Sequence, residues 1–217
     1  MPTVRINLAG PVAITGPSGA VVLEAHFPSR QARRAFAYLV HMGTSGATSD
    51  ELAAGVWPAD PPPAWRSGVA ALVSKLRLLF ATRLDGAIGV ESDFGVYRLH
   101  TADGTWVDLD AAQMAAERGI AALKAGRLED AGASLTIACS ITMRPFLTGD
   151  EGDWIESVRN QLLQTRIRAL ESLAEVHMAT DSFEEAAGWA ETVLKLDPYR
   201  DRAYLVLMRA LAGAGNP

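Results

Sequence analysis

The sequence contains little that would mark a secreted or membrane protein. Its 217 residues include one cysteine, Cys139, so an intramolecular disulfide is excluded and a reducing compartment is the simpler expectation. The N-terminus lacks the basic start and apolar run of a signal peptide. No stretch approaches about 18 uninterrupted apolar residues, and the best candidate, 69–81, is broken by Lys75 and Arg77. We therefore expect a soluble, cytoplasmic protein in which Cys139 is a small buried residue.

The sequence also lacks the patterns of common catalytic and metal sites. Gly16–Gly19 has neither the lysine nor the spacing of a phosphate-binding loop. Asp150–Asp153 precede a predicted helix at Trp154, where negative charge interacts favourably with the helix dipole, so we interpret them as a cap. No two histidines have the spacing of zinc ligands: His26, His41, His100 and His177. We expect no cofactor, no metal and no enzymatic activity.

Positive charge is scarce overall, and it is unevenly distributed. The net charge is −5, but residues 1–100 hold 9 Lys and Arg against 7 Asp and Glu, whereas residues 101–217 hold 11 against 18. Because an acidic domain repels nucleic acid, any DNA contact should fall in the first half. Three arginines of that half are expected to form a solvated helix face, with contact to the DNA backbone as the alternative: Arg30, Arg33 and Arg34.

What is present in the first half alternates between short strands and helices. Residues 4–23 carry apolar residues at every second position between Gly and Pro breaks, which predicts a small antiparallel meander. Ser29 can cap a helix that extends to Gly43. Thr48–Glu51 has the form of a capping box and predicts a short helix that ends at Trp57, before proline.

A third helix is predicted over 64–81, followed by a hairpin over 88–99. Helical spacing places six apolar residues on one face: Val69, Leu72, Val73, Leu76, Leu79 and Phe80. The opposite face is small and polar and carries Ser67, Ala70, Ala71, Ser74 and Leu78. Arg66 and Arg77 fall within roughly 20° of each other on one shoulder of this face, and Lys75 falls on the other.

The second half contains helical segments only, with a repeat of about 34 residues. Aligned on Pro198, the tetratricopeptide register predicts these packing residues: Leu170, Leu173, Ala174, Ala186, Ala190 and Val193. The next unit has the same pattern at Tyr204, Leu207, Met208 and Leu211. We expect either that the whole protein continues beyond Pro217 or that a partner covers Leu205 and Met208, and we favour the truncated C-terminus. A generic helical bundle is the alternative to the repeat.

In order and spacing, these segments resemble the Streptomyces antibiotic regulatory protein (SARP) family. The matching stretches are Arg5–Gly10, Asp50–Leu52, Val56–Pro58 with Pro61 and Pro62, Val73–Arg77, Gly95–Leu99 and Val107–Asp110. The resemblance implies a mostly α fold with a small β component. An OmpR-type winged helix-turn-helix over 1–103 would precede an all-α, tetratricopeptide-like bacterial transcriptional activation domain over 104–217.

The resemblance implies a cytoplasmic, nucleoid-associated transcriptional activator. It would bind tandem repeats in double-stranded promoter DNA, as a dimer or side-by-side pair, and recruit RNA polymerase. An α-helix fits the major groove, and arginine and serine can contact bases and phosphates there. The predicted DNA-binding residues are Arg66, Ser67, Ser74, Lys75, Arg77 and Arg98.

The sequence departs from the family at the positions that read bases. Gly68, Ala70 and Ala71 replace polar residues; they can touch a thymine methyl group but cannot read donors and acceptors. With a charge of only +2 in the first half, a single copy should bind DNA weakly. The alternative hypothesis is therefore a protein-interaction module whose winged helix does not read DNA.

Overall fold

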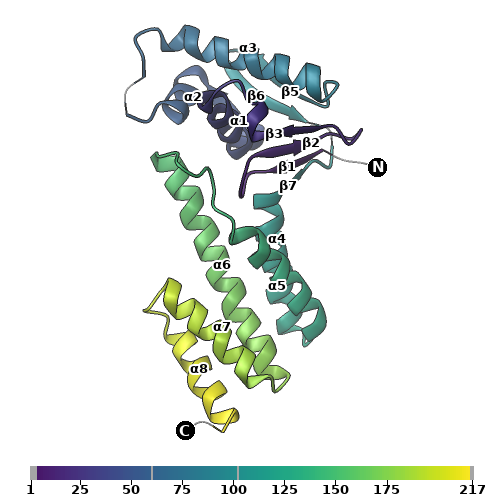
Figure 1. Cartoon of the computed structure of the whole chain (residues 1–217), viewed down its shortest axis with the longest axis vertical. Coiled ribbons are helices and arrows are strands. Elements are labelled where there is room, and N and C mark those ends of the chain that lie inside the picture. The colour runs from purple at the N-terminus through teal and green to yellow at the C-terminus, as the bar shows by residue number, and fades with distance from the viewer. Residues whose placement is uncertain (1–3, 60, 102, 216–217) are drawn as a thin grey trace. The chain divides into compact units, whose positions relative to one another are not determined.

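The computed structural model describes residues 4–59, 61–101 and 103–215. It divides into two compact units (Figure 1). Unit 1 comprises Met1–Asp108 and Pro145–Val158, and unit 2 comprises Leu109–Arg144 and Arg159–Pro217. The stretch Leu109–Arg144 of unit 2 therefore lies, in the sequence, between the two stretches of unit 1.

Unit 1 opens with the predicted antiparallel meander of β1 (Arg5–Asn7), β2 (Ala13–Thr15) and β3 (Val21–Leu23). A fourth strand, β7 (Trp106–Val107), pairs with β1 in parallel, which gives the order β3-β2-β1-β7. The short helix η1 (Glu24–His26) follows β3. β7 could not be predicted from the sequence, because two residues that pair with a distant strand leave no periodic pattern.

Asp108 fixes the end of β1. Its buried carboxylate accepts hydrogen bonds from the backbone N–H groups of Leu8 and Ala9, both at 2.9 Å. The side chain of Asp108, the residue directly after β7, therefore satisfies these two donors in place of another strand.

Three helices follow the meander: α1 (Arg30–Met42), α2 (Ser49–Val56) and α3 (Trp65–Arg83). Ser29 caps α1 by accepting a hydrogen bond from the Ala32 N–H at 3.1 Å. Thr48 and Glu51 form the predicted capping box of α2, since the Thr48 hydroxyl accepts from the Glu51 N–H and the Glu51 carboxylate accepts from the Thr48 N–H. Both predicted helix starts are confirmed.

The inner face of α3 completes the core of unit 1. All six residues predicted to face inward are buried: Val69, Leu72, Val73, Leu76, Leu79 and Phe80. The rings of Phe27 and Phe80 lie 5.5 and 5.6 Å from the ring of Phe36 on α1, so aromatic contacts join α1 to α3.

A three-stranded sheet of order β4-β6-β5 follows α3 in unit 1. Its strands are β4 (Ala47–Thr48), β5 (Ile88–Asp93) and β6 (Val96–Thr101), with η2 (Gly43–Ser45) before β4. Phe94 and Gly95 form a two-residue turn with φ of +46° and +80°, as a type I′ hairpin turn requires. The predicted hairpin is present. Three helices and a hairpin in this order form a winged helix-turn-helix.

Helices make up unit 2. They are α4 (Asp108–Lys124), α5 (Leu128–Thr142), α6 (Asp153–Ala179), α7 (Phe183–Leu196) and α8 (Asp201–Gly213), with the ends of α4 and α6 in unit 1. Gly119 of α4 lies so near α5 that a Cβ there would sit 2.6 Å from the Leu135 Cγ. A larger residue at position 119 would therefore push these helices apart.

The packing residues predicted from the repeat are buried in α6 and α7: Leu170, Leu173, Ala174, Ala186, Ala190 and Val193. In α8 the outcome differs, because Tyr204, Met208 and Leu211 are exposed. Ala203, Val206 and Ala210 form the buried face of α8 instead.

Candidate DNA-binding surface

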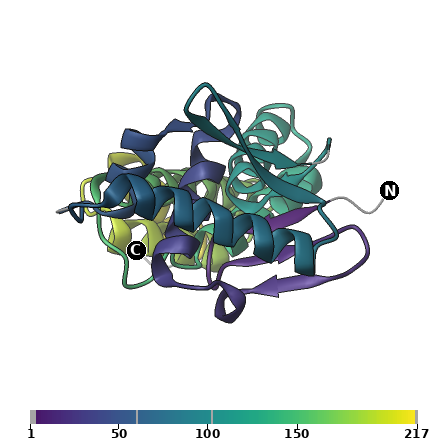
Figure 2. The same cartoon turned by 90° about the horizontal axis from the view of Figure 1, so that it is seen from above.

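The outer face of α3 is open to solvent in unit 1. Every residue predicted for this face is exposed: Ser67, Ala70, Ala71, Ser74 and Leu78. Figure 2 shows α3 along the near side of unit 1. The small side chains leave a slim ridge of the size that the major groove admits. The hydrophobic pattern dictates this orientation, since burial of the opposite face leaves only this one outside.

Arg66 and Ser67 lie at the start of α3. The guanidinium of Arg66 stacks on the ring of Trp65, with its Cζ 4.7 Å from the ring centroid. The Ser67 hydroxyl donates to the Ala64 carbonyl at 2.8 Å, an oxygen that also accepts from the Gly68 N–H. Arg66 remains exposed and retains its donors for a ligand, whereas Ser67 retains its capacity to accept a hydrogen bond.

Arg77 lies about 16 Å from Arg66 along the helix axis, since eleven residues separate them. Its Nε donates to the backbone carbonyl of Val90 on β5 at 2.7 Å. The side chain is therefore held between α3 and the hairpin, with its two terminal nitrogens available. Ser74 and Lys75 are exposed, and no other side chain in the described part of the chain bonds to theirs.

Arg98 is the sole Lys or Arg of the β5–β6 hairpin. Its Nε donates to the Thr44 carbonyl in η2 at 3.2 Å. Gly46 lies under this side chain with φ of +68°, and a Cβ there would come 2.5 Å from the Arg98 Cγ and 2.6 Å from the Tyr97 carbonyl oxygen. The close approach of the backbone at Gly46 therefore positions Arg98.

The tip of the hairpin presents no cation. Phe94 is 99% exposed at the turn, and Glu91 and Asp93 are exposed on β5. Glu91 lies opposite Arg98 in the strand register, and the Nδ1 of its diagonal neighbour His100 is 3.7 Å from the Glu91 carboxylate. An aromatic ring beside two carboxylates is poorly suited to phosphate, so Arg98 is the only hairpin side chain with a charge that favours DNA.

Gly68 does not belong to the outer face. A Cβ at this position would lie 3.2 Å from the ring of Trp57, and the residue is only half-exposed. It is therefore a packing position between the start of α3 and the end of α2. Of the three small residues expected to replace polar base-reading residues, only Ala70 and Ala71 face outward.

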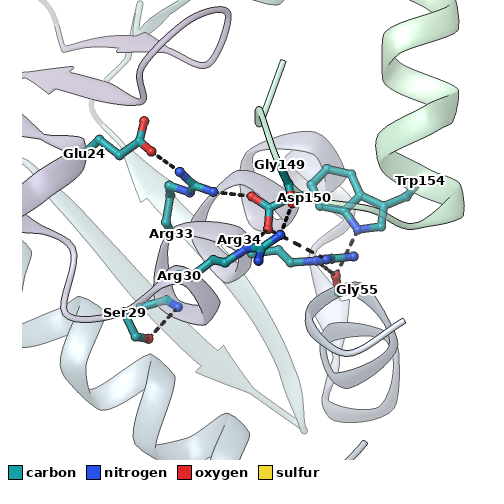
Figure 3. A network of polar contacts seen from close by, with 10 residues as sticks. Glu24, Ser29, Arg30, Arg33, Arg34, Gly55, Gly149, Asp150 and Trp154 are labelled. Atoms are coloured by element: carbon teal, nitrogen blue, oxygen red, sulfur yellow. Dashed lines mark hydrogen bonds and ion pairs between the residues drawn. The ribbon is translucent and has the colours of Figure 1, made fainter. Parts of the chain in front are cut away.

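Three arginines of α1, which were expected to form a solvated face, form a polar cluster instead (Figure 3). Arg33 and Arg34 are largely buried, and Asp150 between them is 1% exposed. The Asp150 carboxylate accepts from the Arg30 Nε at 2.6 Å and also from Arg33, while the Arg34 Nη1 lies 4.0 Å away. Arg33 in addition pairs with Glu24. The prediction of a solvated face was therefore wrong for Arg33 and Arg34.

Arg34 is held by a second partner. Its Nε donates to the Gly55 carbonyl at 2.6 Å, and the Trp154 indole N–H donates to the same oxygen at 2.9 Å. Burial lowers the pKa of Arg34 from its ordinary value, and Asp150 acts in the opposite direction. The cluster thus joins α1, the end of α2 and the segment 145–158.

Asp150 is not the helix cap that its position before Trp154 suggested. Its carboxylate is occupied by α1, and α6 begins three residues later, at Asp153. The same segment is fixed to the meander, because the Gly10 N–H donates to the Pro145 carbonyl at 2.7 Å and Ala9 forms a bridge with Phe146. Sequence spacing alone cannot reveal an ion pair between residues 117 to 120 positions apart.

No group of three or more His, Cys, Asp or Glu residues that could hold a metal ion occurs among the described residues. Cys139 is buried on α5, as expected, and burial raises the pKa of its thiol to about 11. The described helices include none that is both long enough and apolar enough to cross a bilayer.

Comparison with known proteins gives a family match and a structural match. Residues 107–217, just over half of the chain, match the family model of the bacterial transcriptional activator domain. A search of curated protein sequences returned no significant match.

The fold is similar to that of EmbR from Mycobacterium tuberculosis, solved in complex with a low-affinity phosphopeptide. The TM-score is 0.82 at 22% sequence identity, over 99% of this chain and 56% of that one. At this identity the likeness concerns the fold, and the chain spans little more than half the length of EmbR.

Proposed function

The chain belongs to the SARP family of transcriptional regulators, which carry the bacterial transcriptional activator domain and are not a class of enzymes; from this premise we propose that it activates transcription by binding promoter DNA through α3. The observation that carries the proposal is the outer face of α3, which is slim, exposed and flanked by Arg66, Lys75 and Arg77. A helix with such a face can enter the major groove, where these cations meet phosphates or guanine.

Each predicted contact has a specific role in this proposal. Arg66 and Arg77 contact guanine or clamp phosphate on one side of the ridge, and Lys75 meets phosphate on the other. Ser67 and Ser74 bond to bases or backbone from the ridge itself. Arg98 supplies the single phosphate contact of the hairpin.

We further propose that two copies bind side by side on tandem repeats. The acidic tip of the hairpin and the small number of cations give one copy few phosphate contacts, so its affinity should be low. A second copy on the adjacent repeat raises occupancy by making the two binding events cooperative. The acidic helical unit then remains available to recruit RNA polymerase, and the protein acts in the cytoplasm at the nucleoid.

A second candidate is a protein-interaction module that does not read DNA. Phe94 beside Glu91 and Asp93 favours it, because an exposed aromatic ring flanked by carboxylates suits a basic protein surface better than phosphate. The exposed apolar residues of α8 offer a second surface for binding another protein. In this alternative the cations along α3 are solvated.

A mobility-shift experiment separates the two candidates. Duplexes are enriched from a random pool on the full chain and titrated with the wild type and with Ser74→Glu, which places a carboxylate on the exposed ridge. Ser140→Glu, an exposed position on α5, introduces the same charge outside unit 1. We expect Ser74→Glu to abolish the shift and Ser140→Glu to retain it.

Two results would contradict the proposal. Absence of a shift on every duplex supports the interaction module, and equal loss in the two variants shows that α3 does not face the DNA. Cooperativity is tested on one-repeat and two-repeat duplexes: equal affinity per repeat would defeat the side-by-side arrangement.

A further inference from the structure

The centre of the α3 ridge carries almost no hydrogen-bonding capacity. Helical geometry places Ser67, Ala71, Ser74 and Leu78 within roughly 60° of one another, whereas Arg66, Arg77 and Lys75 lie about 70–110° to either side of their centre. All four central residues are exposed, and Leu78 is 65% exposed. The residues that would enter a groove most deeply are thus two hydroxyls, one methyl group and one isobutyl group.

These four side chains cannot read a base pair by paired hydrogen bonds. A hydroxyl has one donor, and that of Ser67 already bonds to the Ala64 carbonyl at 2.8 Å. Bidentate contacts to guanine or adenine need the paired groups of Arg, Asn or Gln, and the ridge centre has none. Beyond single hydrogen bonds with the two serine hydroxyls, what it can offer a base edge is apolar contact.

The major groove presents one apolar group that differs between base pairs, the C5-methyl of thymine. The inference below rests on the proposed function and concerns the same surface of α3. We propose that α3 selects its DNA by thymine methyl groups, through Ala71 at the centre of the ridge and Leu78 two turns further along. Seven residues separate them, which is about 10 Å along the axis, so the two thymines lie about two to three base pairs apart.

The test replaces thymine by deoxyuridine in the enriched duplex, one position at a time. Uracil keeps every hydrogen-bonding group of thymine and lacks only the methyl. We expect two positions at which the wild type binds thymine about fourfold more tightly than uracil, the effect of burying one methyl-sized group. As a control, each of these two thymines is replaced by cytosine or by 5-methylcytosine. The duplex with 5-methylcytosine should bind more tightly than the duplex with cytosine, because it retains the methyl group.

Two variants assign the contacts. Ala71→Gly should reduce the thymine-to-uracil ratio to about one at the first position only, and Leu78→Ala should do so at the second only. Because each ratio is measured within one protein, a change in folding or overall affinity cancels. Ala54→Gly, an exposed helical alanine on α2, is the matched control and should leave both ratios unchanged.

The outcomes are distinguishable. Specific binding with a ratio near one at every thymine overturns the methyl readout and leaves the proposed DNA binding intact. A ratio of four that persists in Ala71→Gly and Leu78→Ala overturns the assignment to these residues. Failure to shift any duplex removes the proposed function, and the inference with it.

Discussion

The Arg77 Nε donates a hydrogen bond of 2.7 Å to the Val90 carbonyl, and this contact joins α3 to the first strand of the hairpin. The donor is the guanidinium of a residue on α3, and the acceptor is a backbone carbonyl of β5. The bond fixes the direction of the side chain before any ligand arrives, so less conformational entropy is lost when its terminal nitrogens bind.

Loss of this bond should lower the stability of the protein. We expect Arg77→Ala to reduce the free energy of unfolding by about 1 kcal/mol, the contribution of one intramolecular hydrogen bond. Lys75→Ala, on the other shoulder of α3, removes a charge without removing such a bond and should have little effect. Urea denaturation measures both, and equal stability of the two variants would contradict the account of Arg77.

Neutralising the Asp150 carboxylate should lower the free energy of unfolding by a large amount. Asp150→Asn removes the carboxylate beside the buried Arg34 and leaves Arg33 with Glu24 alone, and removal of one member of a buried ion pair costs about 3–5 kcal/mol. The neighbouring Glu151 is exposed, so Glu151→Gln should change stability by no more than about 0.5 kcal/mol. Urea denaturation of both variants provides the comparison. Similar unfolding midpoints would mean that the cluster contributes little.

Gly46 and Gly86 form a matched pair. Both have positive φ, +68° and +72°, but only Gly46 lies against other atoms. Gly86→Ala should cost about 1 kcal/mol for the left-handed backbone alone. Gly46→Ala adds contact with the Tyr97 carbonyl and the Arg98 side chain, and we expect a loss of about 3 kcal/mol. Thermal unfolding of the two proteins tests the difference, which should vanish if the loop around Gly46 relaxes freely.

Cys139 should react slowly while the protein is folded. Burial raises the pKa of its thiol to about 11, and the thiolate is the reactive form. At pH 8.5 alkylation by iodoacetamide should be slower by roughly a hundredfold than in guanidinium, where an ordinary thiol is half ionised. The rate should rise with each pH unit up to about 10.5 as the thiolate fraction grows. A rate that levels off near pH 9 in folded protein would contradict a raised pKa.

The elements of unit 1 could be predicted because their signals are local. The inward face of α3 follows from a 3.6-residue period, and the starts of α1 and α2 follow from capping residues within four positions of one another. Exposure of the ridge follows as well, since a helix with one buried face exposes the other. The identity of the side chains on the ridge follows for the same reason, and their contact with DNA stays a prediction.

The remaining features depend on residues that are distant in sequence. The pairing of β7 with β1 joins residues about 100 positions apart, and the cluster at Asp150 joins α1 to a loop about 120 positions later. No periodic pattern reports such contacts. Pro145–Val158 lies within the stretch that matches the activator-domain family, and yet it packs with unit 1.

Arginine contact with DNA is the central claim, and one titration tests it most directly. The enriched duplex is titrated in parallel with the wild type and with Arg66→Ala combined with Arg77→Ala, at fixed salt and with random competitor, after circular dichroism has established that the variant is folded. The account predicts a competitor-resistant complex for the wild type and its loss in the double variant. Equal affinity of the two proteins for the enriched duplex would contradict it.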